Sequence, residues 1–221
     1  MALTTVRNTG ISSLPAISGA NLTSLTAGNL TGTLPAISGA NLTGLPDEFG
    51  MKLLSTHNIS DGTSTQNVAL TGSYPLYLVT FTNVIPNNND NTLRHAFTDD
   101  NFSSANQQLY GCYFRQEARR DNSTSSSTGH QAATGYVRIA DHVGGGNTYE
   151  GVSGAIYYAH MTTTAPKASY WGNINSYHQD ERMSNHQVNG FADTTNAMNG
   201  IAYNYDSGSF KSGQIKLYGM A

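Results

Sequence analysis

Hydrophobic and polar positions alternate with a period of two in several strand-length runs after residue 50. The clearest run, Tyr74–Pro86 (YPLYLVTFTNVIP), places Leu76 and Leu78 on one face and Tyr77 and Val79 on the other. Successive side chains of a β-strand point to opposite sides of the sheet, so this alternation indicates a strand. No run shows sustained helical periodicity, and we therefore expect an all-β fold.

Five further runs have the same character and are separated by polar turns. They are Gln108–Gln116, Gly135–Val143, Gly154–Met161, Asn199–Tyr205 and Gly213–Gly219. Many short strands between Asn-, Ser- and Gly-rich segments are typical of sandwiches of antiparallel strands. We predict an antiparallel, jelly-roll-like β-sandwich over residues 51–221, with polar loops at Arg120–His130 and Lys167–Arg182.

The first fifty residues follow a different pattern. The sequence LPAISGANLT occurs at Leu14–Thr23 and again at Leu34–Thr43, and leucines recur mostly at every eighth position. A helix would scatter this spacing around its circumference, and the prolines and glycines of the repeat oppose a helix further. We expect short extended pieces that are broken by turns.

Two such units are too few to form a core of their own, because repeat folds need three or more stacked units. Identical chains around an axis would supply the missing apolar surface, so we predict a homotrimeric shaft or connector over residues 14–50. Residues 1–13 would attach it, and a flexible linker is the alternative. The residues expected in the trimer core are Leu14, Ile17, Leu22, Leu25, Leu30, Leu34, Ile37, Leu42 and Leu45.

The composition indicates a folded protein with an uncharged polar surface. Charged residues make up 11% of the chain, against about 25% in an ordinary soluble domain, and there are 13 tyrosines. Tyr, Ser, Gly and Asn are favoured in recognition loops. A β-protein that stays soluble without charge is the plainer explanation of the same composition.

Charge and cysteine content exclude several classes. The net charge is -3 and no basic stripe occurs, which opposes nucleic-acid binding. Cys112 is the only cysteine, so an intramolecular disulfide is impossible. No signal-like segment and no apolar run of membrane-spanning length occurs. We expect folding in a cytoplasm and no membrane insertion.

The C-terminal residues Gly208–Ala221 (GSFKSGQIKLYGMA), with NGIAYNYDSGSF before them, resemble the C-terminal domain of tail-fibre and fibre-like virion proteins of tailed bacteriophages. Cyanophages and other marine phages are the nearest comparison. The segment ISGANLTGLP resembles shaft or connector repeats of the same proteins. The resemblance covers both ends of the chain and is weaker over Ser55–Asn196. It implies a homotrimeric fibre on the tail or the head, and it transfers no functional residue because the shared motifs are structural.

Catalytic chemistry has little support in the sequence. A glycosidase needs two carboxylates across a cleft, and nothing places such a pair together. Cys112 lies in a strand-like run and is expected to be a small buried thiol. No His-x-His spacing indicates a metal site, although one histidine repeated around a trimer axis stays open. No cofactor is expected. The carboxylates expected on the solvated surface are Glu117, Asp121, Asp141, Glu150, Asp180 and Glu181.

The expected loop Lys167–Arg182 contains the only tryptophan of the chain. Exposed aromatic side chains supply rigid contact area for a ligand. Tyr170, Trp171, Asn173 and Tyr177 are therefore the predicted receptor contacts. Burial of Trp171 against the sandwich core is the alternative.

These observations together predict a non-enzymatic phage virion fibre, most simply a tail fibre. Its N-terminus would bind other virion proteins, and its tip would bind host-surface glycan or protein weakly at each site, with avidity from several copies. The protein would be assembled in the host cytoplasm and carried by the virion. Two alternatives stay open, namely a head-decoration or connector fibre without host recognition, and a small carbohydrate-active enzyme.

Overall fold

The structure, a computed structural model, describes residues 50–105, 107–178 and 181–221. The chain divides into two units, Met1–Leu45 and Pro46–Ala221, and all described residues belong to the second. The predicted attachment segment and the predicted shaft up to residue 49, with its nine trimer-core residues, lie outside the described residues.

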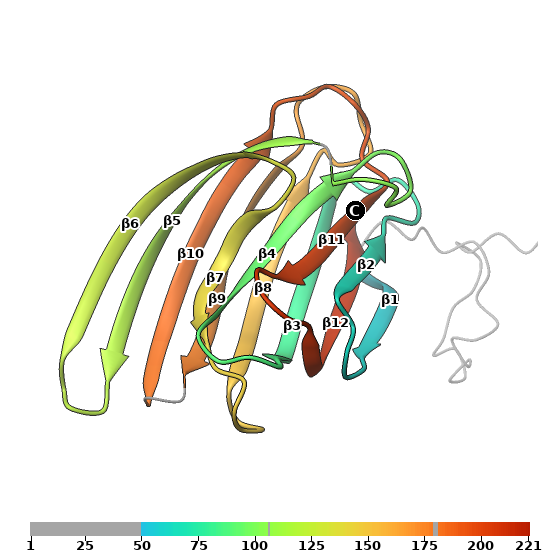
Figure 1. The fold of residues 1–221 in the computed structure, drawn as a ribbon. Coiled ribbons are helices and arrows are strands. Elements are labelled where there is room, and N and C mark those ends of the chain that lie inside the picture. Colours follow the sequence, from blue (N-terminus) through green and yellow to red (C-terminus); the bar gives the residue numbers. More distant parts are fainter. Residues whose placement is uncertain (1–49, 106, 179–180) are drawn as a thin grey trace, which may run out of the picture. The chain divides into compact units, whose positions relative to one another are not determined.

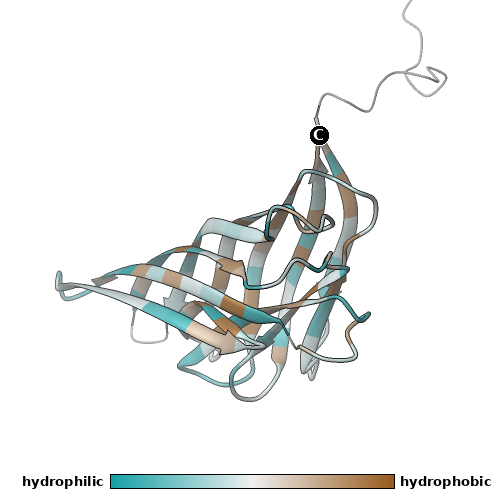
Figure 2. Ribbon diagram, turned by 90° about the horizontal axis from the view of Figure 1, so that it is seen from above, coloured by the Kyte–Doolittle hydropathy of each residue, from teal (hydrophilic) through white to brown (hydrophobic). Residues whose placement is uncertain are grey.

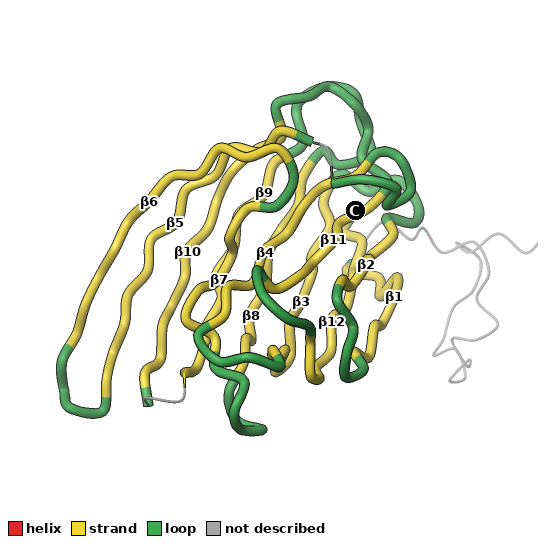
Figure 3. Tube along the Cα trace, viewed as in Figure 1, coloured by secondary structure: helices red, strands yellow, loops and turns green. Residues whose placement is uncertain are grey.

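The described residues form twelve antiparallel strands and no helix, which confirms the all-β prediction (Figures 1 and 3). An eight-stranded sheet has the order β1-β12-β3-β8-β9-β10-β5-β6, and a four-stranded sheet has the order β2-β11-β4-β7. The strands are β1 (Met51–Ile59), β2 (Thr65–Ala69), β3 (Leu76–Pro86), β4 (Asn91–Thr98), β5 (Gln108–Arg119), β6 (Thr124–Thr134), β7 (Val137–Val143), β8 (Gly151–Ala159), β9 (Ser169–His178), β10 (Arg182–Ala192), β11 (Gly200–Tyr205) and β12 (Phe210–Met220).

The strand order within this sandwich is that of a jelly roll. When the hairpins β5–β6 and β9–β10 are left out, the order β1-β12-β3-β8 faces the order β2-β11-β4-β7. The first strand of the described domain therefore pairs with the last, and Met51 lies opposite Met220. The predicted antiparallel β-sandwich is confirmed.

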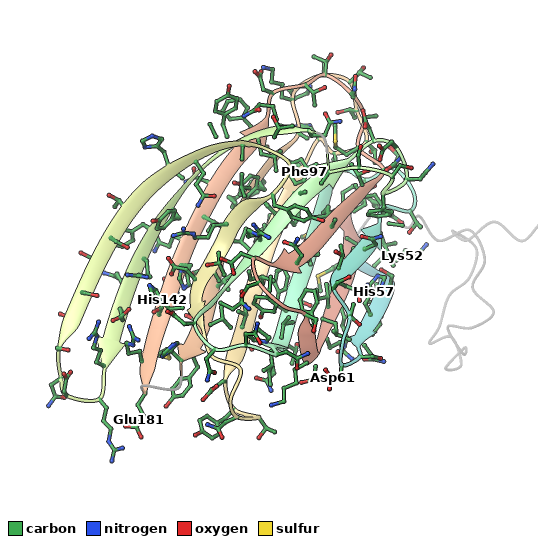
Figure 4. All side chains as sticks on the ribbon, viewed as in Figure 1. Lys52, His57, Asp61, Phe97, His142 and Glu181 are labelled. Atoms are coloured by element: carbon green, nitrogen blue, oxygen red, sulfur yellow. The ribbon has the colours of Figure 1, made fainter. Side chains whose placement is uncertain are left out.

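The two sheets enclose a core of aliphatic and aromatic side chains. On β3, Tyr77 and Val79 are fully buried in this core, and Leu76 and Leu78 point to the opposite side of the sheet, as the alternation predicted. Phe97 on β4 is also fully buried, and Figure 4 shows it between the sheets. Burial of this apolar surface is the main favourable term for the sandwich.

The two inserted hairpins make the eight-stranded sheet wider than its partner. Strands β10, β5 and β6 extend past the four-stranded sheet, and we call these three strands the wing (Figure 1). Strand β7 packs over β9 and also contacts the wing. At the outer edge, β6 pairs with β5 alone, and none of its residues is fully buried.

Two segments that were expected to be loops contain strands. Strand β6 occupies much of Arg120–His130, and β9 occupies most of Lys167–Arg182. Their Ser, Thr and Asn residues suggested loops, but such residues fit an exposed sheet face once neighbouring strands supply the hydrogen bonds. Hydrophilic and hydrophobic residues alternate along many of the strands in Figure 2.

Candidate functional site

The eight-stranded sheet has one side that points away from the four-stranded sheet, which we call the outer face. A row of paired residues crosses it, with one residue from each strand: Leu53, Tyr218, Leu78, Tyr157, Trp171, Asn189, Cys112 and His130. Glu117 is the only Asp or Glu within the eight strands, and it is buried on the opposite side. The strands therefore give the outer face no carboxylate.

Two aromatic stacks lie on this face. The rings of Trp171 and Tyr157 on neighbouring strands are 5.7 Å apart between centroids and 16° from parallel. The rings of Tyr110 and Phe191 are 5.4 Å apart and 19° from parallel. Trp171 is 43% exposed, so the alternative that it caps the core is wrong. Stacking fixes the orientation of these rings while leaving apolar surface open to solvent.

Amide side chains fill the outer face of β9 and β10 beside these rings. The Asn185 side-chain amide donates to the Oδ1 atoms of Asn173 at 2.6 Å and Asn175 at 2.9 Å. The exposed Gln187 opposes Asn173 in the register. We call the following residues the aromatic–amide patch: Tyr110, Tyr157, Trp171, Asn173, Asn175, Asn185, Gln187, Asn189 and Phe191.

The patch borders two hollows of about 320 and 470 Å³ over the wing. Cys112 lies in both, and its thiol donates to Asn189 Oδ1 at 2.7 Å. The thiol is exposed, so the expectation of a small buried thiol is wrong. Strand β5 has one face toward the interior and one face toward solvent. Cys112 lies on the solvent face with Tyr110 and Phe114.

Three of the four predicted receptor residues, Trp171, Asn173 and Tyr177, share the outer face. Tyr170 does not, because it is 2% exposed and its ring packs against His95 and Phe97 in the core. Tyr170 is therefore removed from the predicted contacts. In SYWGNINSYH, side chains two positions apart share a face, and this period of two separates the buried Tyr170 from the predicted residues on the outer face. The loop interpretation missed this signal.

Two glycines make room for Tyr170. A Cβ atom at Gly111 would lie 2.2 Å from the Tyr170 hydroxyl, and one at Gly190 would lie 2.6 Å from its ring. Burial raises the pKa of Tyr170. The side chain therefore belongs to the core and stays uncharged. Apart from Asn175 on β9, the remaining members of the patch come from β5, β8 and β10, and sequence reasoning did not connect them with Trp171.

A Ser-His-Asp set lies on the inner side of the sheet. The Ser176 hydroxyl is 3.0 Å from His186 Nε2, and His186 Nδ1 is 3.7 Å from Asp141 Oδ1. All three residues are buried, and the hydroxyl also donates to the main-chain oxygen of Asp141. Burial lowers the pKa of His186 to about 4, so it is neutral at pH 7. The Ser176 hydroxyl has no access to solvent and so cannot meet a substrate as a nucleophile. These three side chains therefore contribute to packing.

Three carboxylates expected on the surface are buried, which corrects that expectation. Glu117 binds Arg119 at 2.6 Å, and Asp141 binds both Arg115 at 3.0 Å and Arg138 at 2.9 Å. Glu150 accepts main-chain hydrogen bonds from Gly146 and Asn147 and one from the side chain of Asn147. Buried charges require such partners. Asp121 and Glu181 are exposed, and Asp180 lies outside the described residues.

Within the described residues, no group of three or more His, Cys, Asp or Glu side chains could hold a metal ion. No helix long and apolar enough to cross a membrane occurs in the same part of the chain. Comparison of the chain with protein-family models, with curated proteins and with solved structures gave no match in any of the three.

Proposed function

We propose that this protein is a homotrimeric virion fibre of a tailed bacteriophage and that the described domain is its tip, which binds host-surface glycan through the aromatic–amide patch. The observation that carries this proposal is the exposed Trp171, stacked on Tyr157 and bordered by amides. A ring that is already held in place stacks on the apolar face of a sugar at small entropic cost. The resemblance of the repeat and of the C-terminal ending supports the fibre assignment.

The chemistry of the patch fits uncharged saccharides. Each amide group donates and accepts hydrogen bonds, and so does each sugar hydroxyl. The strands place no carboxylate on the outer face, and ion pairing has no part in this recognition. Salt therefore has little effect on the expected affinity. Binding occurs without catalysis in this proposal, and the buried carboxylates serve the fold.

The start of β1 is suited to contact between copies of the chain. Met51 and Leu53 are 53% and 50% exposed, and they follow Gly50, where the repeat region ends. Exposed apolar side chains that lie together favour an interface. Three copies joined here carry three patches, which turns weak single-site affinity into avidity. The N-terminal segment attaches the fibre to other virion proteins, and assembly takes place in the host cytoplasm.

The test is binding of the full chain to an array of neutral and acidic bacterial oligosaccharides. Trp171→Ala is the variant, and Thr82→Ala on the exposed part of β3 is its control. We expect the wild type and T82A to bind neutral oligosaccharides and W171A to lose this binding while its melting temperature stays within a few degrees. Absence of binding by the wild type, or binding by W171A equal to it, would overturn the proposal and favour a decoration fibre.

A further inference from the structure

An open cleft of about 590 Å³ lies between the edge strand β6 and the β4–β7 side of the four-stranded sheet. It shares no residue with the aromatic–amide patch, and His130, Gln131 and Ala132 of β6 line both this cleft and the hollow of about 320 Å³ beside the patch. Arg94 on β4, Arg138 on β7 and Tyr136 in the turn before β7 line one side, and Gln131 on β6 lines the other. The cleft therefore brings two guanidinium groups to a surface that is otherwise poor in charge.

The Arg94 side chain is held in one orientation. Its Nε donates to Asn204 Oδ1 at 3.2 Å, and its Nη2 donates to the main-chain oxygen of Tyr205 at 3.3 Å. The guanidinium carbon lies 5.5 Å from the centre of the Tyr136 ring. These contacts fix the planar group but leave Nη1 without a bond to a described residue. A guanidinium fixed in this way loses little freedom when it binds an anion.

Among the six arginines that the structure describes, Arg94 is the only one without a described carboxylate within 4.0 Å. Each of the other five has such a partner. Arg94 is therefore a half-buried arginine whose charge no described carboxylate balances within 4.0 Å. Half-buried charges are screened less than exposed ones, so an anion in the cleft would be attracted strongly.

The remaining charges at the cleft also leave a positive excess. Arg138 and Arg115 share the single carboxylate of Asp141. Asp206 is the one carboxylate on the lining, and its Oδ1 atom accepts a hydrogen bond from the main-chain nitrogen of Thr92 at 3.0 Å. Asp206 is exposed and offsets only part of the charge of the arginines.

We propose that this cleft binds the anionic group of an acidic saccharide, a carboxylate or a sulfate. Arg94 pairs with the anion, because a planar guanidinium matches both groups. Asp206 and Gln131 are placed to bond the neighbouring sugar hydroxyls. The site adds selection for charge to a chain whose outer face selects uncharged sugars, and it does not depend on the function proposed for that face.

The experiment measures affinity of the full chain, by calorimetry at low salt, for three oligosaccharides of equal length: oligogalacturonate, dextran sulfate and neutral dextran. Arg94→Gln is the variant. Arg120→Gln is the matched control, because it removes the same charge at the exposed turn between β5 and β6. We expect at least one acidic probe to bind tenfold or more tightly than neutral dextran, and R94Q but not R120Q to lose this preference. Preference for oligogalacturonate alone assigns a carboxylate, and equal binding of both acidic probes assigns a general anion site.

A second variant separates lost binding from a local change of fold. The Gln131 side-chain oxygen accepts from the main-chain nitrogen of Arg138 at 2.6 Å, and Gln131→Glu keeps this acceptor while it adds negative charge to the cleft. We expect Q131E to lose the acidic probe as R94Q does, and Trp171→Ala to retain it. Equal binding of acidic and neutral probes by the wild type, or equal losses in R94Q and R120Q, would overturn the proposal without bearing on the outer face.

Discussion

The hydroxyl of Tyr203 on β11 donates a hydrogen bond of 2.9 Å to the hydroxyl of Tyr158 on β8 and so joins the two sheets through the core. The Tyr158 oxygen also lies 2.9 Å from Nδ1 of His95 on β4. All three side chains are fully buried. The Tyr158 hydroxyl thus bonds both Tyr203 and His95, and the three groups form one polar chain inside an aromatic core.

Removal of the middle member of this chain should cost more than removal of its end. Tyr158→Phe leaves the Tyr203 donor and the His95 Nδ1 atom unpaired, and each buried unpaired group costs about 1–3 kcal/mol. Tyr203→Phe removes only the terminal donor and should cost about 1 kcal/mol. Urea unfolding of the full chain measures both losses. Equal losses would show that the chain does not act as a unit.

The domain should lose stability in acid. Burial lowers the pKa of His95 to about 3 and that of His186 to about 4, against about 6.5 in an unfolded chain. The unfolded state therefore binds protons first, and the stability contributed above pH 6.5 is lost progressively as the pH falls toward 4 and then 3. Melting temperatures recorded by circular dichroism from pH 7 to pH 4 should fall.

His95→Phe should make that fall less steep, because one of the buried histidines that protonate on unfolding is gone. His130→Gln on the exposed face of β6 is the matched control for the loss of one histidine. A slope in H95F equal to that of the wild type would assign the acid sensitivity to other groups.

Gly111→Ala should destabilise the domain through Tyr170 in particular. The new methyl would lie 2.2 Å from the Tyr170 hydroxyl and 3.3 Å from a main-chain oxygen of Asn189, so the hydroxyl is the main obstacle. Overpacking of this kind costs about 1–3 kcal/mol. The double variant G111A/Y170F should recover most of the loss in a thermal melt. If the second change restores nothing, the backbone contact is the cause.

Alanine substitutions at two adjacent positions on β9 should lower the stability of the domain by very different amounts. Tyr170→Ala opens a cavity in the core and should cost about 3–5 kcal/mol, the range found for large aromatic side chains. Trp171→Ala should cost less than about 1 kcal/mol, because its ring is largely on the surface. Denaturant titration of both variants measures this difference. A W171A variant that unfolds would mean that the ring supports the sandwich.

Leu53→Asp should weaken association of the copies, since it places a charge among exposed apolar side chains at the start of β1. Thr56→Asp on the same strand is the control. Light scattering should give a trimer mass for the wild type and T56D, and a lower mass for L53D at micromolar concentration. A monomeric wild type would contradict the fibre proposal.

The fold was predictable where each strand shows its environment locally. The alternation in Tyr74–Pro86 is clear because β3 lies inside the sheet between β12 and β8. Strands β6 and β9 were missed because their pairing with distant segments decides their structure, while their polar residues are equally common in loops. Pairing of β1 with β12 is a contact between the two ends of the domain, which a local pattern does not reveal.

The candidate site was predictable in part for the same reason. Composition singled out Trp171 and its neighbours, and three of the four chosen residues share one face. The burial of Tyr170 depends on space left by Gly111 and Gly190, which lie on other strands. The stacking partner Tyr157 comes from β8, and the amides of β10 join the patch only through the register of the sheet.

Because Met51 pairs with Met220, the first and last strands of the domain begin and end at the same end of the eight-stranded sheet. A short added peptide from residue 221 to residue 50 would close the chain without disturbing either sheet. New ends opened between β5 and β6, at the far end of the wing, would then give a circular permutant with every strand pair retained. The termini of such a permutant would lie on the wing. Its binding surfaces would be unchanged but would face the opposite way relative to the point of attachment.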